Sequence, residues 1–90
     1  MSDTDRLETY RGREVVLDSA GPFVYAGTLA DFDAHYLVLT DADVHDLRDT
    51  TTTREVYVLE LKRHGIPANR RRVLVRREDV LSLSALEDVV

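Results

Sequence analysis

The sequence predicts a small, mainly β protein: five short strands in a strongly bent barrel, a short helix before them, and a helical insertion between the third and fourth strands. Short runs of β-branched and aromatic residues alternate with turn-forming residues along the chain. A glycine lies inside the longest run, where a sharp bend of the strand would require one. A full set of helix-boundary residues interrupts the strand pattern near residues 52–67. Residues 1–90 are expected to form one domain.

The chain is predicted to begin with a short helix. Asp5 to Tyr10 can form one or two turns, with Thr4 or Ser2 as the N-cap and Gly12 ending the helix. So short a helix persists only when it docks on the rest of the protein. The β-branched run Val15-Val16-Leu17 then predicts the first strand.

The second strand is predicted to be the longest. It runs from Phe23 to Phe32, after a turn over residues 18–22, and apolar residues lie on both of its faces. A strand of this kind is covered on both sides or curls around a core. Gly27 in its middle is therefore expected to be a structural bend residue, as small barrels need. After a turn at Asp33-Ala34, His35 to Thr40 is predicted as the third strand.

The connection between the third and fourth strands is predicted to span about residues 44–71 and to contain a helix from about residue 53 to residue 64. The Val-Tyr-Val run at 56–58 favours a strand by propensity, so that alternative stays open. The helix is favoured by the capping box Thr52-x-x-Glu55, by a basic last turn and by Gly65 directly after it.

The last two strands are predicted at Arg72–Arg77 and Val80–Ser84, joined by Glu78-Asp79. A lone barrel of this size buries a modest fraction of its surface, and its edge strands expose unpaired backbone groups. We therefore expect the protein to assemble with further copies of itself.

The composition excludes several classes of protein. The chain holds no Cys, which removes disulfides, thiolate nucleophiles and zinc ribbons. No apolar run approaches the ~20 residues that a membrane span needs, and the first residues lack the apolar core of a secretory signal. We therefore expect a cytoplasmic protein that contacts no membrane. No catalytic constellation or phosphate-cradling glycine loop stands out, so the sequence predicts no enzyme and no cofactor.

The net charge of −5 is an average over unlike segments. Residues 54–77 carry eight basic and two acidic side chains, whereas the segments before and after them are acidic. The basic residues include Arg70-Arg71-Arg72, which can contact phosphate groups or pair with the acidic segment 41–49 of the same or a neighbouring subunit. That acidic segment lacks the glycine and the terminal glutamate of an EF-hand loop, so it predicts no metal site.

Two stretches resemble the signatures of the Sm-like family, which includes the Sm and LSm proteins and the bacterial RNA chaperone Hfq. The first, from Tyr25 to Asp43, has the bend glycine Gly27, an apolar residue two positions on, then Asp33 and an apolar run that ends in acidic residues. The second, from Val73 to Ser84, has an apolar strand, an arginine pair in place of Arg-Gly, a turn and a final apolar strand. The resemblance covers about residues 5–85 and implies the Sm-like barrel, assembly into a ring, and RNA as a ligand.

The sequence also departs from the family pattern. Leu37 stands where Sm and LSm proteins have an Asn that reads a uracil edge, or that Asn is deleted, and Hfq also lacks it. Arg77 replaces the glycine of the second signature, and the 44–71 connection is longer than the short forms of the family. These departures indicate a divergent member whose nucleotide pocket is altered.

By this resemblance, the candidate RNA-binding residues are Asp33, His35, Tyr36, Arg76 and Arg77. His35 takes the place of a ring that stacks on a base, with Tyr36 beside it. Asp33 would brace the loop by accepting hydrogen bonds from backbone N–H groups. Arg76 would contact phosphate or base. The structural alternatives are that one ring packs in the barrel and that Arg76 is a solvated cation at a strand end.

The leading hypothesis is a ring-forming Sm-like protein that binds single-stranded RNA in a non-standard way. The alternative is an Sm-like assembly or protein-interaction module that has lost the nucleotide pocket. The missing Asn, Arg77, the long insertion and the acidic total favour this alternative. A third possibility is a small barrel whose 54–77 segment binds an acidic partner.

Overall fold

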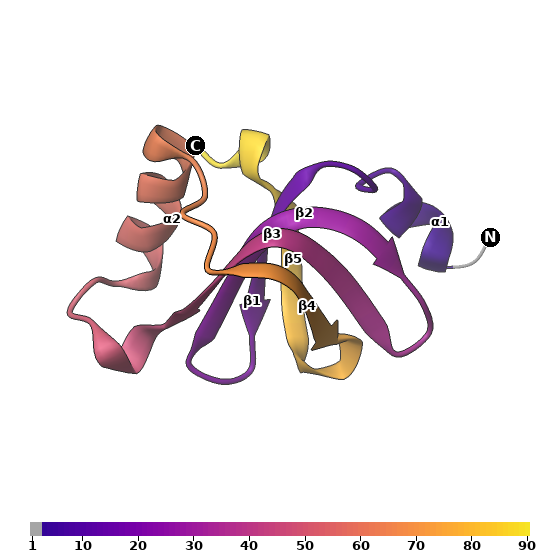
Figure 1. Cartoon of the computed structure of the whole chain (residues 1–90), viewed down its shortest axis with the longest axis horizontal. Coiled ribbons are helices and arrows are strands. Elements are labelled where there is room, and N and C mark those ends of the chain that lie inside the picture. Colours follow the sequence, from indigo (N-terminus) through magenta and orange to yellow (C-terminus); the bar gives the residue numbers. More distant parts are fainter. Residues whose placement is uncertain (1–2) are drawn as a thin grey trace.

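Five antiparallel strands form one strongly bent sheet in a computed structural model that describes residues 3–90 (Figure 1). The strands are β1 (Glu14–Ser19), β2 (Phe23–Phe32), β3 (Tyr36–Asp46), β4 (Arg70–Arg76) and β5 (Val80–Ala85), and their order in the sheet is β4-β3-β2-β1-β5. The barrel is therefore open, with β4 and β5 as its two edges. Helices α1 (Asp3–Glu8) and α2 (Arg54–His64) lie at opposite ends of the sheet in Figure 1. The predicted fold class is confirmed.

Three short 3₁₀ turns complete the fold: η1 (Leu47–Asp49), η2 (Arg77–Asp79) and η3 (Leu86–Asp88). The connection between β3 and β4 therefore runs from residue 47 to residue 69, which is shorter at both ends than the predicted 44–71. The third strand does not end at Thr40, because the acidic residues that follow pair with β2 as far as Asp46 opposite Phe23. The fourth strand begins at Arg70, opposite Ala42, and it ends before Arg77.

A β-bulge bends the sheet at Gly27. The partners Ala26↔Asp43 and Thr28↔Thr40 leave Asp41 and Ala42 opposite this one glycine. Asp41 adopts a positive φ of 48°, as the extra residue of a bulge often does. A Cβ at Gly27 would lie 2.9 Å from the Cβ of Ala42, closer than two carbon atoms can approach. Gly27 is needed here because the two strands come so close at the bend.

Two apolar cores lie on opposite faces of the sheet. The inner core, enclosed by the bend, contains Val15, Leu17, Leu29, Leu37, Leu39, Ala42 and Val75. The second core lies between the sheet and α2 and contains Val16, Val24, Ala26, Tyr57, Leu61 and Leu86. Strand β2 supplies residues to both cores, since Val24 and Ala26 contact the second and Leu29 the first. The two apolar faces of this strand are thus both covered, as its sequence predicts.

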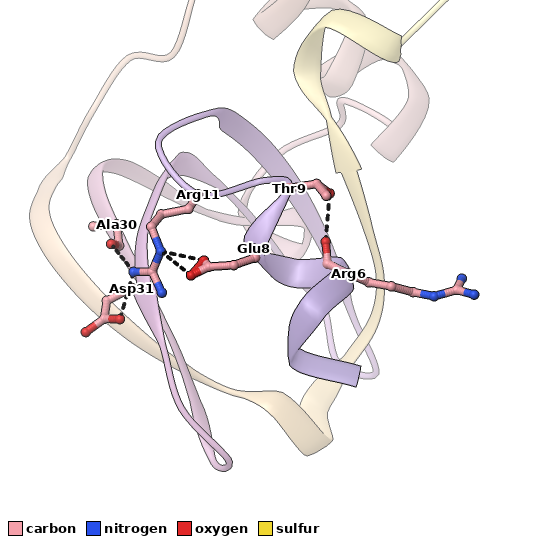
Figure 2. A network of polar contacts seen from close by, with 6 residues as sticks. All are labelled: Arg6, Glu8, Thr9, Arg11, Ala30 and Asp31. Carbon is pink, nitrogen blue, oxygen red and sulfur yellow. Dashed lines mark hydrogen bonds and ion pairs between the residues drawn. The ribbon is translucent and has the colours of Figure 1, made fainter. Parts of the chain in front are cut away.

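Helix α1 covers one end of the inner core through Leu7, with Tyr10 in the turns that follow. The helix starts earlier than predicted, so Thr4 lies inside it rather than at its N-cap, and Ser2 lies outside the described residues. Figure 2 shows the Arg11 guanidinium between the carboxyl groups of Glu8 and Asp31. It forms an ion pair with each of them, at 2.8 and 3.0 Å. The Arg11 hydrogen bonds lower the pKa of both carboxyl groups. This network ties the short helix to β2.

Helix α2 confirms the helical interpretation of the insertion, with a shifted start. Its N-cap is Thr53, whose hydroxyl oxygen accepts a hydrogen bond from the Val56 N–H at 3.2 Å, so the capping box predicted at Thr52 does not form. Gly65 ends the helix with φ 85°, and its N–H donates to the Leu61 carbonyl at 2.8 Å. Arg54 pairs with Asp18 of β1 at 2.8 Å. The helix is thereby held on the sheet at its first turn.

Candidate nucleic-acid interface

Two turns meet at the end of the sheet near α1: the turn from β2 to β3 and the η2 turn from β4 to β5. Tyr36 pairs with Arg76 across the β3–β4 ladder, and the Arg77 N–H donates to the His35 carbonyl at 2.8 Å. Between the turns is an open hollow of about 500 Å³, lined by Ala34, His35, Tyr36, Arg76, Arg77 and Glu78. Four of the five predicted RNA-binding residues therefore line one hollow.

Asp33, the fifth predicted residue, does not line the hollow but stabilises the turn from β2 to β3. Its Oδ1 accepts hydrogen bonds from the backbone N–H groups of His35 and Tyr36, both at 2.8 Å. Its own N–H donates to the Tyr36 carbonyl at 2.9 Å. The two backbone hydrogen bonds lower the pKa of the Asp33 carboxyl, because they stabilise the carboxylate. Asp33 is thus occupied with holding the turn, as expected of an Asp in this place.

The two rings of the turn are at the surface. His35 is exposed, and Tyr36 is 39% exposed. Neither ring packs in the barrel, which removes the structural alternative in which one of them is a core residue. Both rings are available to an aromatic ligand, and stacking of a nucleic-acid base on such a ring is worth about 1–3 kcal/mol.

The two arginines of the second turn have different roles in the structure. Arg76 is exposed, and its guanidinium forms an ion pair with Glu78. Arg77 is half-buried, and its Nη1 donates to the Asp33 carbonyl at 2.7 Å. Arg77, in place of the family glycine, links the two turns by both its main chain and its side chain. Arg76 is the cation that a ligand can reach, in competition with Glu78.

Leu37 shows what the hollow lacks. In the Sm and LSm pattern it takes the place of the Asn, unless that Asn is deleted, and it is only 3% exposed because its side chain belongs to the inner core. No side chain at this position can therefore reach a base edge. Sequence reasoning did not single out Glu78 or Ala34 as lining residues. The available signal was that Glu78 follows the two arginines in the turn between the last two strands.

Arg70, Arg71 and Arg72 lie at the other end of β4 and are exposed. Within residues 3–90, none of them forms an ion pair with the acidic segment 41–49, where Asp46 pairs instead with Arg48 at 2.8 Å. The intramolecular form of the predicted pairing is therefore not observed. Among the described residues, no group of His, Asp and Glu side chains is arranged to hold a metal ion. None of the helices described is long and apolar enough to span a membrane.

Comparisons with known proteins identify the fold. No protein-family model and no curated protein sequence matches the chain. Among solved structures, the chain is similar to an Sm protein of Pyrococcus abyssii in complex with a uridine heptamer. The TM-score is 0.63 at 18% sequence identity, over 94% of this chain and 99% of the other. With its five-stranded bent sheet, its N-terminal helix and this match, the chain has an Sm-like fold.

Proposed function

We propose that this protein is a subunit of a cytoplasmic, homo-oligomeric Sm-like ring that binds single-stranded RNA at the hollow between the two turns. The observation that carries the proposal is the hollow itself, in which two exposed rings, His35 and Tyr36, lie beside the exposed cation Arg76. Rings and an arginine side by side are the combination that single-stranded nucleic acids use, through base stacking and phosphate contact. The similar Pyrococcus protein is in complex with a uridine heptamer, which supports this ligand class.

The hollow is expected to bind RNA with little preference for base identity. Stacking tolerates every base, because each has a flat aromatic face. Recognition of a base edge needs a hydrogen-bonding side chain, and both alternatives for the Asn position lack one: the buried Leu37 takes its place, or the Asn is deleted. The ion pair of Arg76 with Glu78 weakens the attraction for phosphate, so affinity is expected to be low.

The ring is supported by the two open edges of the sheet. β4 and β5 leave rows of unpaired backbone groups, and each carries an exposed leucine, Leu74 at 54% and Leu81 at 71%. Pairing of the β4 edge with the β5 edge of another copy would satisfy both rows and cover both leucines. Such a contact joins two different surfaces, so repetition closes a ring when the rotation per subunit permits it.

Binding of labelled single-stranded RNA, followed by fluorescence anisotropy at low salt, tests the RNA half of the proposal. We expect U-rich and A-rich strands to bind with similar affinity. Replacing both rings, His35→Ala with Tyr36→Ala, should weaken binding about tenfold or more, since each stack is worth about 1–3 kcal/mol. Arg76→Ala should lower the dependence of affinity on salt concentration by about one phosphate contact.

His64→Ala is the matched control, because His64 is an exposed histidine on α2 rather than in the hollow. Its affinity for RNA should equal that of the unchanged protein. Undetectable binding at low salt, or an affinity that the His35/Tyr36 replacement leaves unchanged, would reject RNA binding at this hollow.

The second candidate function is an oligomeric assembly or protein-interaction module without an RNA ligand. It is favoured by Arg77, whose guanidinium donates to the Asp33 carbonyl rather than to a ligand. It is also favoured by the acidic Glu78, which forms an ion pair with Arg76. The same experiment separates the two candidates. A protein that assembles, as measured by light scattering, and yet binds no RNA would be the assembly module.

A further inference from the structure

The two edges of the sheet carry opposite charge. Edge strand β4 and the residue after it hold five arginines and no acid: Arg70, Arg71, Arg72, Arg76 and Arg77. The turns on either side of edge strand β5 hold four acids, Glu78, Asp79, Glu87 and Asp88, and residues 78–90 contain no base. Opposite charge on the two edges attracts one copy to the next in a single head-to-tail orientation.

We propose that Arg70, Arg71 and Arg72, named here the arginine triad, bind the acidic segment Glu87-Asp88 of the next copy of this chain. The proposal rests on the assembly part of the proposed function, in which β4 pairs with β5 of the next copy. The triad is then an inter-subunit contact and not an RNA site.

The faces of the two strands limit how they can pair. Val73 and Val75 of β4 pack on the inner core, and so does Leu83 of β5. Ala85 of β5 is buried and lies opposite the core residue Val15, so it is on the same face as Leu83. Because side chains alternate along a strand, a shared sheet that continues the inner core places Val73 opposite Leu83 or Ala85 of the next copy. A shift by one residue would turn all apolar side chains of one strand to the wrong face.

Each of these two registers brings the triad to the acids. With Val73 opposite Leu83, Arg71 lies opposite Ala85, the last residue of β5 in the next copy, and Arg70 lies where η3 begins, the turn that holds Glu87 and Asp88. With Val73 opposite Ala85, the whole triad extends past the end of β5 and lies alongside η3. An arginine side chain reaches over neighbouring strand positions, so an ion pair can form in either register.

The groups involved are free to form this contact. The triad residues are exposed and have no ion pair within residues 3–90. In the same part of the chain, Asp88 is exposed and has no ion pair, and Glu87 pairs only with Arg13, with 69% of its side chain exposed. Within residues 3–90, the triad and Asp88 therefore lack ion-pair partners, and Glu87 would share its carboxylate between Arg13 and the triad of the next copy.

A charge-swap experiment tests the proposal. The first variant carries Arg70→Glu and Arg71→Glu, the second Glu87→Arg and Asp88→Arg, and the third all four changes. The first and second variants alone should assemble at least about tenfold less tightly, measured as the apparent dissociation constant by analytical ultracentrifugation. An equimolar mixture of these two variants should recover assembly, because each acidic edge then meets a basic one. The four-change variant should recover it alone.

Arg63→Glu is the matched control, since Arg63 is an exposed arginine on α2 and belongs neither to β4 nor to η3. It should assemble as the unchanged protein does. Circular dichroism of every variant identifies those that fail to fold, and recovery in the mixture would itself prove that both single-edge variants are folded.

The outcomes separate this proposal from the proposed function. An unchanged protein that is monomeric at all concentrations would reject both. A ring whose mass is insensitive to the Arg70/Arg71 change would reject only the arginine contact. If this change leaves assembly intact but weakens RNA binding, the triad is an RNA contact, and the inter-subunit proposal is wrong.

Discussion

The two cores of this molecule are built in different ways. The inner core is made of apolar side chains, and six of its seven buried members lie on β1, β2 and β3. The second core joins the sheet to α2, and it places a buried polar group, Asp43, beside its apolar residues. The inner core forms because apolar side chains alternate along the strands. The second core forms only when the insertion packs on the sheet, and hydrogen bonds as well as apolar burial hold it together.

The directional contacts of the second core meet at Asp43, which is 6% exposed. Its carboxylate accepts hydrogen bonds from the Tyr57 hydroxyl of α2 and from the Asn69 amide, the latter at 2.8 Å. Asn69 also accepts from the Val44 N–H at 3.0 Å, so it extends the ladder beside β3. The His45 ring stacks on Tyr57 with 4.0 Å between the ring centres. These contacts fix α2 and the C-terminal end of the insertion to one short stretch of β3.

The largest expected effect comes from truncating one leucine in each core. Leu39→Ala in the inner core should lower the free energy of unfolding by about 2–5 kcal/mol, because Leu39 is fully buried. Leu61 in the second core is buried to nearly the same degree, so Leu61→Ala should lower the free energy of unfolding by a similar amount. This loss should loosen α2 before it loosens the sheet. Chemical denaturation gives the free energies, and amide hydrogen exchange shows where protection is lost. Equal loss of protection in α2 and in the strands of both variants would make the two cores one cooperative unit.

A smaller effect is expected from the polar group of the second core. Asp43→Ala leaves the buried Tyr57 hydroxyl without its acceptor and removes one of the two hydrogen bonds that the Asn69 amide donates, which costs about 1–3 kcal/mol. Asp49→Ala is the matched control, an exposed aspartate in η1, and it should change stability by less than about 0.5 kcal/mol. Equal stability of the two variants in urea denaturation would show that Asp43 does not hold the insertion.

The smallest effect is confined to alkaline solution. Burial, and then the hydrogen bond to Asp43, raise the pKa of the Tyr57 phenol above its ordinary value of about 10. Since the folded state holds this proton more tightly than the unfolded state, the stabilisation is complete below pH about 10 and is lost as the pH rises above it. Tyr57→Phe should therefore flatten the decline of stability in this range, as measured by urea denaturation at a series of pH values. An unchanged slope would contradict the burial of this phenol.

The two faces of β2 and the C-terminal end of α2 were the parts that the sequence could predict. The two apolar faces of β2 follow from side-chain alternation, and Gly65 marks the end of α2 because a positive φ favours glycine. The end of β3 was not predictable from local pattern, since acidic residues up to Asp46 have low strand propensity and are held by pairing with β2. The choice of Thr53 over Thr52 as N-cap depends on where the chain leaves η1, which a run of four threonines does not reveal.

The candidate site was predictable in position and not in contacts. The resemblance placed His35, Tyr36 and Arg76 at one site, and the structure brings them together. It gave no reason to expect that Arg77 would donate to the Asp33 carbonyl, since in the family pattern this position is a glycine without a side chain. The contact with Glu78 likewise depends on the geometry of η2, which local sequence does not determine.

Lys62 is the only lysine of the chain, and its position has a practical consequence. Its Nζ donates to the Leu86 and Glu87 carbonyls, at 3.2 and 2.6 Å, and so ties α2 to η3. An amine held by two carbonyl groups is a poorer nucleophile than a free one. The rate at which an amine-directed reagent modifies this single side chain therefore reports whether η3 is seated on α2, in a protein that needs no engineered label.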